Sequence, residues 1–282
     1  MVEKMKKYLK HKFNSDDPVL ISVIDELPLW SAPFGLKLLD IIKIKKNITV
    51  LDIGCGLGFQ LIEVAQRLGE SSTVYGIDPW GKALKRAEKK IKKYKIQNVR
   101  IINSSAEKLP FENSFFDLII SNNGINNVEN LEKTLMECRR VCKPKAQFVF
   151  TMNLDGSMIE FYNIFEKVLA KNKMYSEIDN MKKHIYKKRR PLDEIKELLK
   201  ESGFLINKIA HDNFYLRYSD AITMFNHSFI KYWFLDSWKQ IVPAEKLESV
   251  FDEVELYLDK IADKKGEIKL SIPFIAVDAI KK

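Results

Sequence analysis

Short apolar runs alternate with helical segments between residues 48 and 152, and this alternation restricts the fold more than any other feature of the chain. Apolar, largely β-branched runs predict strands, whereas apolar residues spaced three and four apart predict helices. Strands joined by helices of this length require right-handed crossovers, which place them parallel in one sheet with helices on both faces. The strands are predicted at 48–53, 72–78, 99–103, 116–121 and 146–152, and the helices at 59–69, 84–95 and 131–141.

The pattern changes after residue 152. One helix is expected beyond Asp155, and a second is expected to begin at Pro191 and end near Gly203, because proline favours the first turn of a helix. Two further strands, at 204–210 and 270–279, bring the predicted number to seven. The segment between them is aromatic and has helical spacing, so we expect it to cap the sheet. The predicted domains are an N-terminal helical segment covering the cofactor site, the core, the cap and the final core strand, at 1–45, 46–212, 213–264 and 265–282.

Composition limits the functional classes. The chain has 282 residues, a net charge of +9 and no apolar run of the roughly 18 residues that a membrane span requires. The basic N-terminus lacks a signal-peptide core, so a cytoplasmic protein is expected. The three cysteines show no C-x-x-C pair and have no histidine nearby in sequence, which favours small buried residues over a metal site. Most lysine-rich segments are interpreted as solvated helix faces, but the run KKHIYKKRR at 182–190 leaves nucleic-acid binding open.

Three glycines follow the first predicted strand, in VLDIGCGLGFQL at residues 50–61. Glycine lets the backbone turn sharply and expose N–H groups to a closely approaching ligand. Asp78 ends the second predicted strand, where a carboxylate typically binds ribose hydroxyls. A dinucleotide fingerprint requires a glycine at position 59, which is Phe59, and Asp52 before the loop would repel a pyrophosphate. The loop therefore indicates a nucleoside cofactor carrying a positive charge, and not NAD.

The motifs LDIGCGLG, GID, SAEKLPF, FDLIISNN and RVCKP, in this order, resemble those of class I S-adenosylmethionine-dependent methyltransferases. They are most similar to the branch that includes ubiquinone and menaquinone biosynthesis enzymes. The resemblance covers about residues 48–152. It implies a doubly wound, Rossmann-like α/β fold whose seven-stranded sheet is mostly parallel with an antiparallel last strand. It also implies S-adenosylmethionine as the cofactor.

The same resemblance implies a set of cofactor contacts. Asp52 would hold the methionine end, the three glycines would line its path, and Asp78 would bind both ribose hydroxyls. Ser105 and Ala106 stand where the family commonly has an Asp-Ala pair, so the adenine contact would weaken or pass to Glu107. The expected cofactor-binding residues are Trp30, Asp52, Gly54, Gly56, Gly58, Asp78, Pro79, Trp80, Ser105, Ala106, Glu107 and Asn122.

No catalytic residue is identified with the same force. A sulfonium donor is already electrophilic, so in-line positioning of the acceptor is the main requirement, and a base is needed only for a protonated acceptor. Asn122 and Asn123 follow the fourth strand at the carboxyl edge, where either binding or turn formation explains them. His211 is expected just after the sixth strand and is the first-ranked, though weak, candidate base.

The acceptor is expected to be a small organic molecule. Aromatic residues are frequent in the predicted cap, and we expect those that do not form its core to enclose a pocket. Trp30 and Phe34 either close over the cofactor or pack in the core. Two alternatives stay open: an RNA- or protein-modifying methyltransferase that uses the basic surface, and a non-catalytic S-adenosylmethionine-binding protein. The aromatics of the cap are Phe214, Tyr215, Tyr218, Phe225, Phe229, Tyr232, Trp233, Phe234 and Trp238.

Overall fold

A computed structural model describes residues 6–282. The chain divides into two compact units. The sheet unit comprises Leu27–Leu154, Lys188–Asp212 and Phe274–Lys282, and the helical unit comprises residues 6–26, Asp155–Lys187 and Asn213–Pro273. The helical unit thus contains residues 155–187, which the sequence assigned to the core. The first five residues of the predicted segment 1–45 lie outside the described residues.

Seven strands form one sheet in the order β3-β2-β1-β4-β5-β7-β6. Strands β1 to β5 pair in parallel with their neighbours, and β7 runs antiparallel to β5, with Gln147 opposite Ile280 and Asn153 opposite Phe274. This confirms the predicted α/β sheet with its antiparallel last strand. The strands are β1 Thr49–Ile53, β2 Thr73–Asp78, β3 Val99–Asn103, β4 Phe116–Asn122, β5 Cys142–Asn153, β6 Phe204–Tyr218 and β7 Ile268–Lys281.

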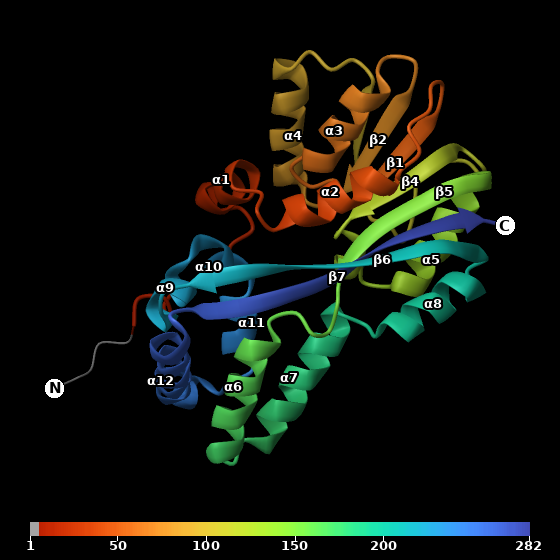
Figure 1. The fold of residues 1–282 in the computed structure, drawn as a ribbon. Helices are drawn as coiled ribbons and strands as arrows, with labels where there is room; N and C mark the ends of the chain where they lie inside the picture. Colours follow the sequence, from red (N-terminus) through yellow and green to blue (C-terminus); the bar gives the residue numbers. More distant parts are fainter. Residues whose placement is uncertain (1–5) are drawn as a thin grey trace. The chain divides into compact units, whose positions relative to one another are not determined.

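Helices cover both faces of the sheet unit (Figure 1). On one face α2, α3 and α4 pack on a cluster that includes Val50, Val74 and Leu118. On the other face α5 and α8 pack on a cluster that includes Ile53 and Phe148. Burial on both sides explains why the strands are apolar almost without interruption. The helices are α2 Ser31–Ile41, α3 Phe59–Leu68, α4 Gly81–Lys93, α5 Leu131–Val141 and α8 Leu192–Glu201, with a short 3-10 turn at Ile125–Asn127.

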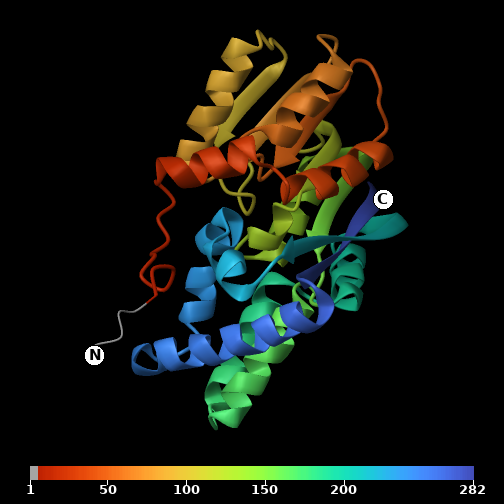
Figure 2. The same cartoon turned by 60° about the vertical axis from the view of Figure 1, so that its left-hand side comes forward.

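Helices with an aromatic core build the helical unit. Trp238 is fully buried, its ring lies 3.9 Å from that of Phe161, and its indole N–H donates to the Tyr162 hydroxyl at 3.1 Å. Helix α12 packs against α6 and crosses it at an angle in Figure 2. The helices of this unit are α1 Pro18–Glu26, α6 Ile159–Lys171, α7 Tyr175–Lys188, α9 Ala221–Asn226, α10 Ser228–Trp233, α11 Leu235–Lys239 and α12 Leu247–Lys265, with a 3-10 turn at Ala244–Lys246.

Two sequence expectations differ from the structure. Strand β6 continues to Tyr218 instead of ending near residue 210, so His211 lies inside a strand. The helical spacing between 222 and 233 belongs to two helices, because the backbone leaves the helical conformation at His227.

Within residues 6–282, no single helix is both long and apolar enough to cross a membrane. Only α1 and α2, counted together across the break between them, meet that test of length and composition.

Candidate active site

The three glycines of the loop after β1 are required for different reasons. All have positive φ, at 72° for Gly54, 49° for Gly56 and 83° for Gly58, a region that other residues rarely adopt. A Cβ on Gly54 would lie 3.0 Å from the Cα of Gly124, and one on Gly58 would lie 2.9 Å from the Cβ of Ala87. A Cβ on Gly56 would meet only the carboxylate of Asp78, at 3.9 Å. Gly54 and Gly58 therefore allow close packing, whereas Gly56 leaves space beside a carboxylate.

Asp78 joins the end of β2 to this loop. Its Oδ2 accepts the N–H of Gly56 at 2.9 Å, and its Oδ1 accepts the N–H of Trp80 at 2.8 Å. Burial raises the pKa of Asp78, and the N–H donors of Trp80 and Gly56 oppose that shift. Each carboxylate oxygen has a second lone pair, so the side chain can still accept a hydrogen bond from a ligand hydroxyl.

Two polar side chains beside the loop are buried without partners. Asp52 is 1% exposed, and neither of its oxygens has a hydrogen-bond partner among residues 6–282. Burial, and next the charge of Asp78, raise the pKa of Asp52 well above its usual value. Gln60, in the first turn of α3, is 3% exposed, and neither atom of its amide has a partner in the described part of the chain. Such groups are rare in proteins and require an explanation.

Asn122 anchors helix α2 over this region. Its amide nitrogen donates to the carbonyl of Ser31 at 3.1 Å, and its amide oxygen accepts the hydroxyl of Thr151 at 3.1 Å. The other end of α2 is held by Gln147, which accepts the N–H of Lys43 and donates to the carbonyl of Ile41. Both ends of the Asn122 amide thus serve the fold, and its contact with the cofactor stays a prediction.

Gly35 brings α2 close to the glycine loop. A Cβ at this position would lie 2.5 Å from Oε1 of Gln60, 2.7 Å from the ring of Phe59 and 3.1 Å from the amide nitrogen of Asn122. Glycine inside a helix costs about 1 kcal/mol relative to alanine. The close approach of the Gln60 amide gives this glycine a structural reason.

The loop after β3 carries the residues predicted to contact adenine. Ser105 is exposed, Ala106 is buried and Glu107 is partly buried. The carboxylate of Glu107 accepts the N–H groups of Glu129 at 2.7 Å and Asn130 at 3.3 Å. Partial burial favours a higher pKa for Glu107, but hydrogen bonds to its carboxylate outweigh burial and lower it. Glu107 therefore has structural partners before any ligand is considered.

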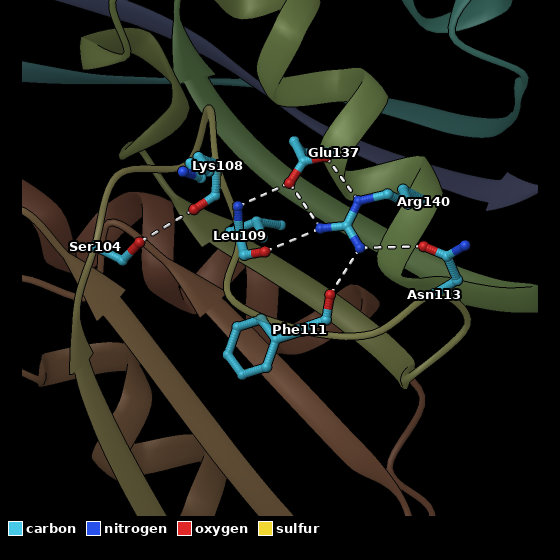
Figure 3. Close-up of polar contacts among 7 residues, drawn as sticks. All are labelled: Ser104, Lys108, Leu109, Phe111, Asn113, Glu137 and Arg140. Atoms are coloured by element: carbon cyan, nitrogen blue, oxygen red, sulfur yellow. Dashed lines mark hydrogen bonds and ion pairs between the residues drawn. The ribbon is translucent and has the colours of Figure 1, made fainter.

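An ion pair on α5 holds the same loop (Figure 3). Arg140 donates to the carbonyls of Phe111 at 2.7 Å and Leu109 at 2.9 Å, and it pairs with Glu137 through two further contacts. Glu137 in turn accepts the N–H of Leu109 at 2.8 Å. The bond to Arg140 lowers the pKa of Glu137, and the bond to Glu137 raises that of Arg140. This network was not anticipated from the sequence.

The two catalytic candidates occupy structural positions. Asn123 has a φ of 54°, and its side-chain oxygen accepts the amide of Asn126 at 2.8 Å, which fits the turn-forming interpretation. His211 is exposed within β6, at the edge of the sheet, and not in a loop beyond a strand end as expected. The turn-like sequence after residue 210 is paired in the sheet, which explains the misplacement.

The remaining aromatic candidates differ in burial. Phe34 is fully buried and its ring lies 4.6 Å from that of Phe274, so it belongs to the core. Trp30, just before α2, and Trp80, just before α4, are partly buried, and Pro79 is exposed. In the helical unit, Phe225 and Trp238 are fully buried, whereas Trp233 is 38% exposed. The cap aromatics are thus divided between core and surface.

Three residues of the basic run at 182–190 are paired or buried. Lys182 pairs with Glu166 at 2.8 Å, Arg189 is buried, and Arg190 pairs with Glu132 and Glu194. The three cysteines are buried free thiols. Burial raises the pKa of Cys142 to about 12 and that of Cys138 well above its usual value. Across residues 6–282, no cluster of three His, Cys, Asp or Glu side chains is arranged to hold a metal ion.

Comparison with known proteins agrees with the motifs. Residues 44–176 match the family model described as a methyltransferase domain. A demethylmenaquinone methyltransferase from Geobacillus stearothermophilus is 35% identical over 101 residues, which are 36% of this chain and 43% of that protein. The matched region therefore spans less than half the length of this relative.

Solved structures share the fold at lower identity. The YcgJ protein from Bacillus subtilis is 19% identical with a TM-score of 0.59, over 89% of this chain and 98% of that one. A geranyl diphosphate methyltransferase solved with S-adenosylmethionine is 16% identical with a TM-score of 0.53, over 94% and 93% of the two chains. These likenesses confirm the architecture of the chain.

Proposed function

We propose that this chain binds S-adenosylmethionine at the glycine loop and catalyses methyl transfer, because residues 44–176 match a methyltransferase domain and the motifs resemble those of class I S-adenosylmethionine-dependent methyltransferases. The observation that carries the proposal is the placement of Asp78. Its carboxylate is fixed by the N–H groups of Gly56 and Trp80 beside the one loop glycine that has open space. A carboxylate fixed in this way is suited to two neighbouring ribose hydroxyls.

The other residues at the loop fit the cofactor. The family relationship supports S-adenosylmethionine, and the partnerless carboxylate of Asp52 suits a ligand that carries an ammonium group. When bound, S-adenosylmethionine supplies a methyl group activated by the sulfonium charge. Trp30 would close over the methionine part, Pro79 and Trp80 would lie beside the adenine, and Ser105, Ala106 or Glu107 would contact the adenine from the loop after β3. In favourable cases, holding the two reactants in the reacting geometry lowers the activation barrier by up to about 7–11 kcal/mol.

We further propose a small organic molecule as the methyl acceptor. Relatives named demethylmenaquinone methyltransferases favour it. The pairing or burial of Lys182, Arg189 and Arg190 weakens the alternative of a nucleic-acid surface at the basic run. An exposed aromatic of the predicted cap such as Trp233 would contact an apolar acceptor, whereas Phe225 and Trp238 are committed to the core of the helical unit.

The experiment measures S-adenosylhomocysteine formed from S-adenosylmethionine with quinol-like and phenolic small molecules, with RNA and with peptides. We expect turnover with at least one small acceptor, at rates that change little between about 50 and 200 mM salt. Turnover with RNA alone would overturn the proposal of a small-molecule acceptor. Such turnover should fall steeply over that salt range, because binding to RNA releases counterions. Binding of NAD in place of S-adenosylmethionine would overturn the assignment of the cofactor.

A further inference from the structure

Helix α4 and the two residues after it carry most of the net charge of the chain. Residues 82–95 contain eight lysines and arginines and a single acid, Glu88, which gives this segment a net charge of +7, whereas the whole chain has +9. The rest of the chain is therefore close to neutral. The cations of the segment are Lys82, Lys85, Arg86, Lys89, Lys90, Lys92, Lys93 and Lys95.

Five of these lysines lie on the side of α4 that points away from the sheet. The helix packs on β3, the edge strand of the sheet, and buries Ala83, Leu84 and Ala87 (Figure 1). An α-helix turns through about 100° per residue, so the five lysines fall within about 100° of one another, opposite the buried side chains. All five are exposed, and we call them the lysine row: Lys82, Lys85, Lys89, Lys92 and Lys93.

The lysine row is unpaired. Within residues 6–282, no ion pair, hydrogen bond or ring contact involves the side chain of any of its five lysines. The basic run at 182–190 differs, because Lys182 pairs with Glu166 and Arg190 pairs with Glu132 and Glu194. A helix face that only meets solvent commonly mixes charges of both signs. The lysine row contains one sign alone.

This arrangement lowers the stability of the helix. Lys85, Lys89 and Lys93 follow one another at i, i+4 spacing, where side chains are neighbours and like charges repel. A glutamate at position 89 would replace both repulsions by attractions. The fold therefore gains nothing from three lysines at these positions, and their use is expected outside it.

We propose that the lysine row of α4 binds the surface of an anionic membrane. Side chains on one side of a straight helix reach a plane together, and each lysine at an anionic lipid surface adds to the affinity. Tyr94, just beyond the helix, is 52% exposed and suits the headgroup region, where tyrosine is enriched. The choice of a lipid partner rests on the proposed function, because an apolar methyl acceptor partitions into membranes.

Nucleic acid is the competing partner for a cationic surface. Recognition of phosphates and bases favours arginine, whose planar guanidinium binds them through two parallel hydrogen bonds, and the lysine row contains no arginine. Single strands are bound by aromatic side chains that stack on successive bases, and Tyr94 is the one aromatic residue in 81–95. Both observations favour lipid over nucleic acid.

The test measures binding to vesicles of phosphatidylserine and phosphatidylcholine in equal parts by co-sedimentation. Vesicles of phosphatidylcholine alone and poly(U) RNA, the latter followed by fluorescence anisotropy, are the other two probes. The wild type is compared with the triple variant Lys85→Gln, Lys89→Gln and Lys93→Gln. These residues are exposed, so the variant should fold.

A control variant loses the same charge outside α4. It carries Lys200→Gln, Lys208→Gln and Lys265→Gln, at exposed lysines of α8, β6 and α12. A general effect of net charge would weaken vesicle binding equally in the two variants. An effect of the lysine row would weaken it in the α4 variant alone.

We expect the wild type to bind the anionic vesicles and not those of phosphatidylcholine. The α4 variant should bind the anionic vesicles about 100-fold more weakly, because each lysine contributes about fivefold. Binding by the wild type should weaken between about 50 and 200 mM salt. Absence of binding to anionic vesicles, equal losses in the two variants, or tighter binding to poly(U) than to the vesicles would overturn the inference.

Two further measurements separate this inference from the proposed function and from a structural role. The α4 variant should bind S-adenosylhomocysteine with the Kd of the wild type in titration calorimetry. It should unfold at the temperature of the wild type or above, because repulsion within the helix is relieved. A lower unfolding temperature would assign the lysine row to the fold and overturn the inference. A wild type that binds the vesicles but not S-adenosylhomocysteine would overturn the proposed function and support the membrane surface.

Discussion

Two polar regions of the sheet unit differ in how completely their side chains are paired. Arg140 and Glu137 pair with each other and with backbone groups, and this network joins α5 to the loop after β3. Around the glycine loop, Asp52 and Gln60 are buried without partners among the described residues. A satisfied network stabilises a fold, whereas an unsatisfied one lowers its stability and is retained where a ligand completes it. The difference separates a structural region from a binding region within one sheet.

The largest effect is expected at Asp78. Asp78→Ala removes the acceptor for the ribose hydroxyls and releases the N–H groups of Gly56 and Trp80. Loss of two hydrogen bonds to a charged group corresponds to about 3 kcal/mol or more, which is about 100-fold in Kd. Titration calorimetry with S-adenosylhomocysteine measures it. Affinity within about threefold of the wild type would show that Asp78 has no such role.

Arg140 should affect stability more than binding. Arg140→Met removes hydrogen bonds to two backbone carbonyls and leaves Glu137 without its cation. The free energy of unfolding, measured in urea, should therefore be about 2–3 kcal/mol lower than that of the wild type. Arg67→Met, which breaks an exposed pair with Glu63, is the matched control and should change stability by less than about 0.5 kcal/mol. Equal losses in the two variants would remove the contrast between a network and a surface pair.

The pH dependence of the two regions should have opposite signs. The folded protein holds the pKa of Asp52 above its usual value, so the folded state binds more protons than the unfolded state above about pH 4. The wild type should therefore lose stability relative to Asp52→Asn as the pH rises, by up to about 1.4 kcal/mol per pH unit. The pKa of Glu137 is lowered, so stability relative to Glu137→Gln should fall as the pH drops below about 4.5. Urea unfolding between about pH 3.5 and 7 measures both, and slopes of one sign would contradict this assignment.

The smallest effect is expected at Gly35. Gly35→Ala gains helix propensity but places a methyl group 2.5 Å from Oε1 of Gln60, so a net loss of about 1 kcal/mol is expected. In a Gln60→Ala background the contact with Oε1 is absent while the ring of Phe59 stays 2.7 Å from the added methyl group, so the loss caused by Gly35→Ala should become smaller. A double-mutant cycle measures the coupling. Additive effects would show that Gln60 does not lie beneath Gly35.

The sequence predicted the parallel strands and the helices between them because both have strong periodicity. It did not predict the length of β6, since residues 211–213 are polar and interrupt the apolar pattern, and this edge strand buries little. The roles of Asn122 and Arg140 depend on partners distant in sequence, which no local pattern indicates. Gln60 had a detectable signal: it lies four residues before Val64 and eight before Leu68, on a row that is otherwise buried.

A crystal structure of the protein with S-adenosylhomocysteine tests the central claim most directly. Both ribose hydroxyls are expected within hydrogen-bonding distance of Asp78, and the ammonium group of the amino-acid end is expected at Asp52. A nucleoside bound elsewhere, or an amino-acid end that leaves Asp52 unpaired, would contradict the proposed function.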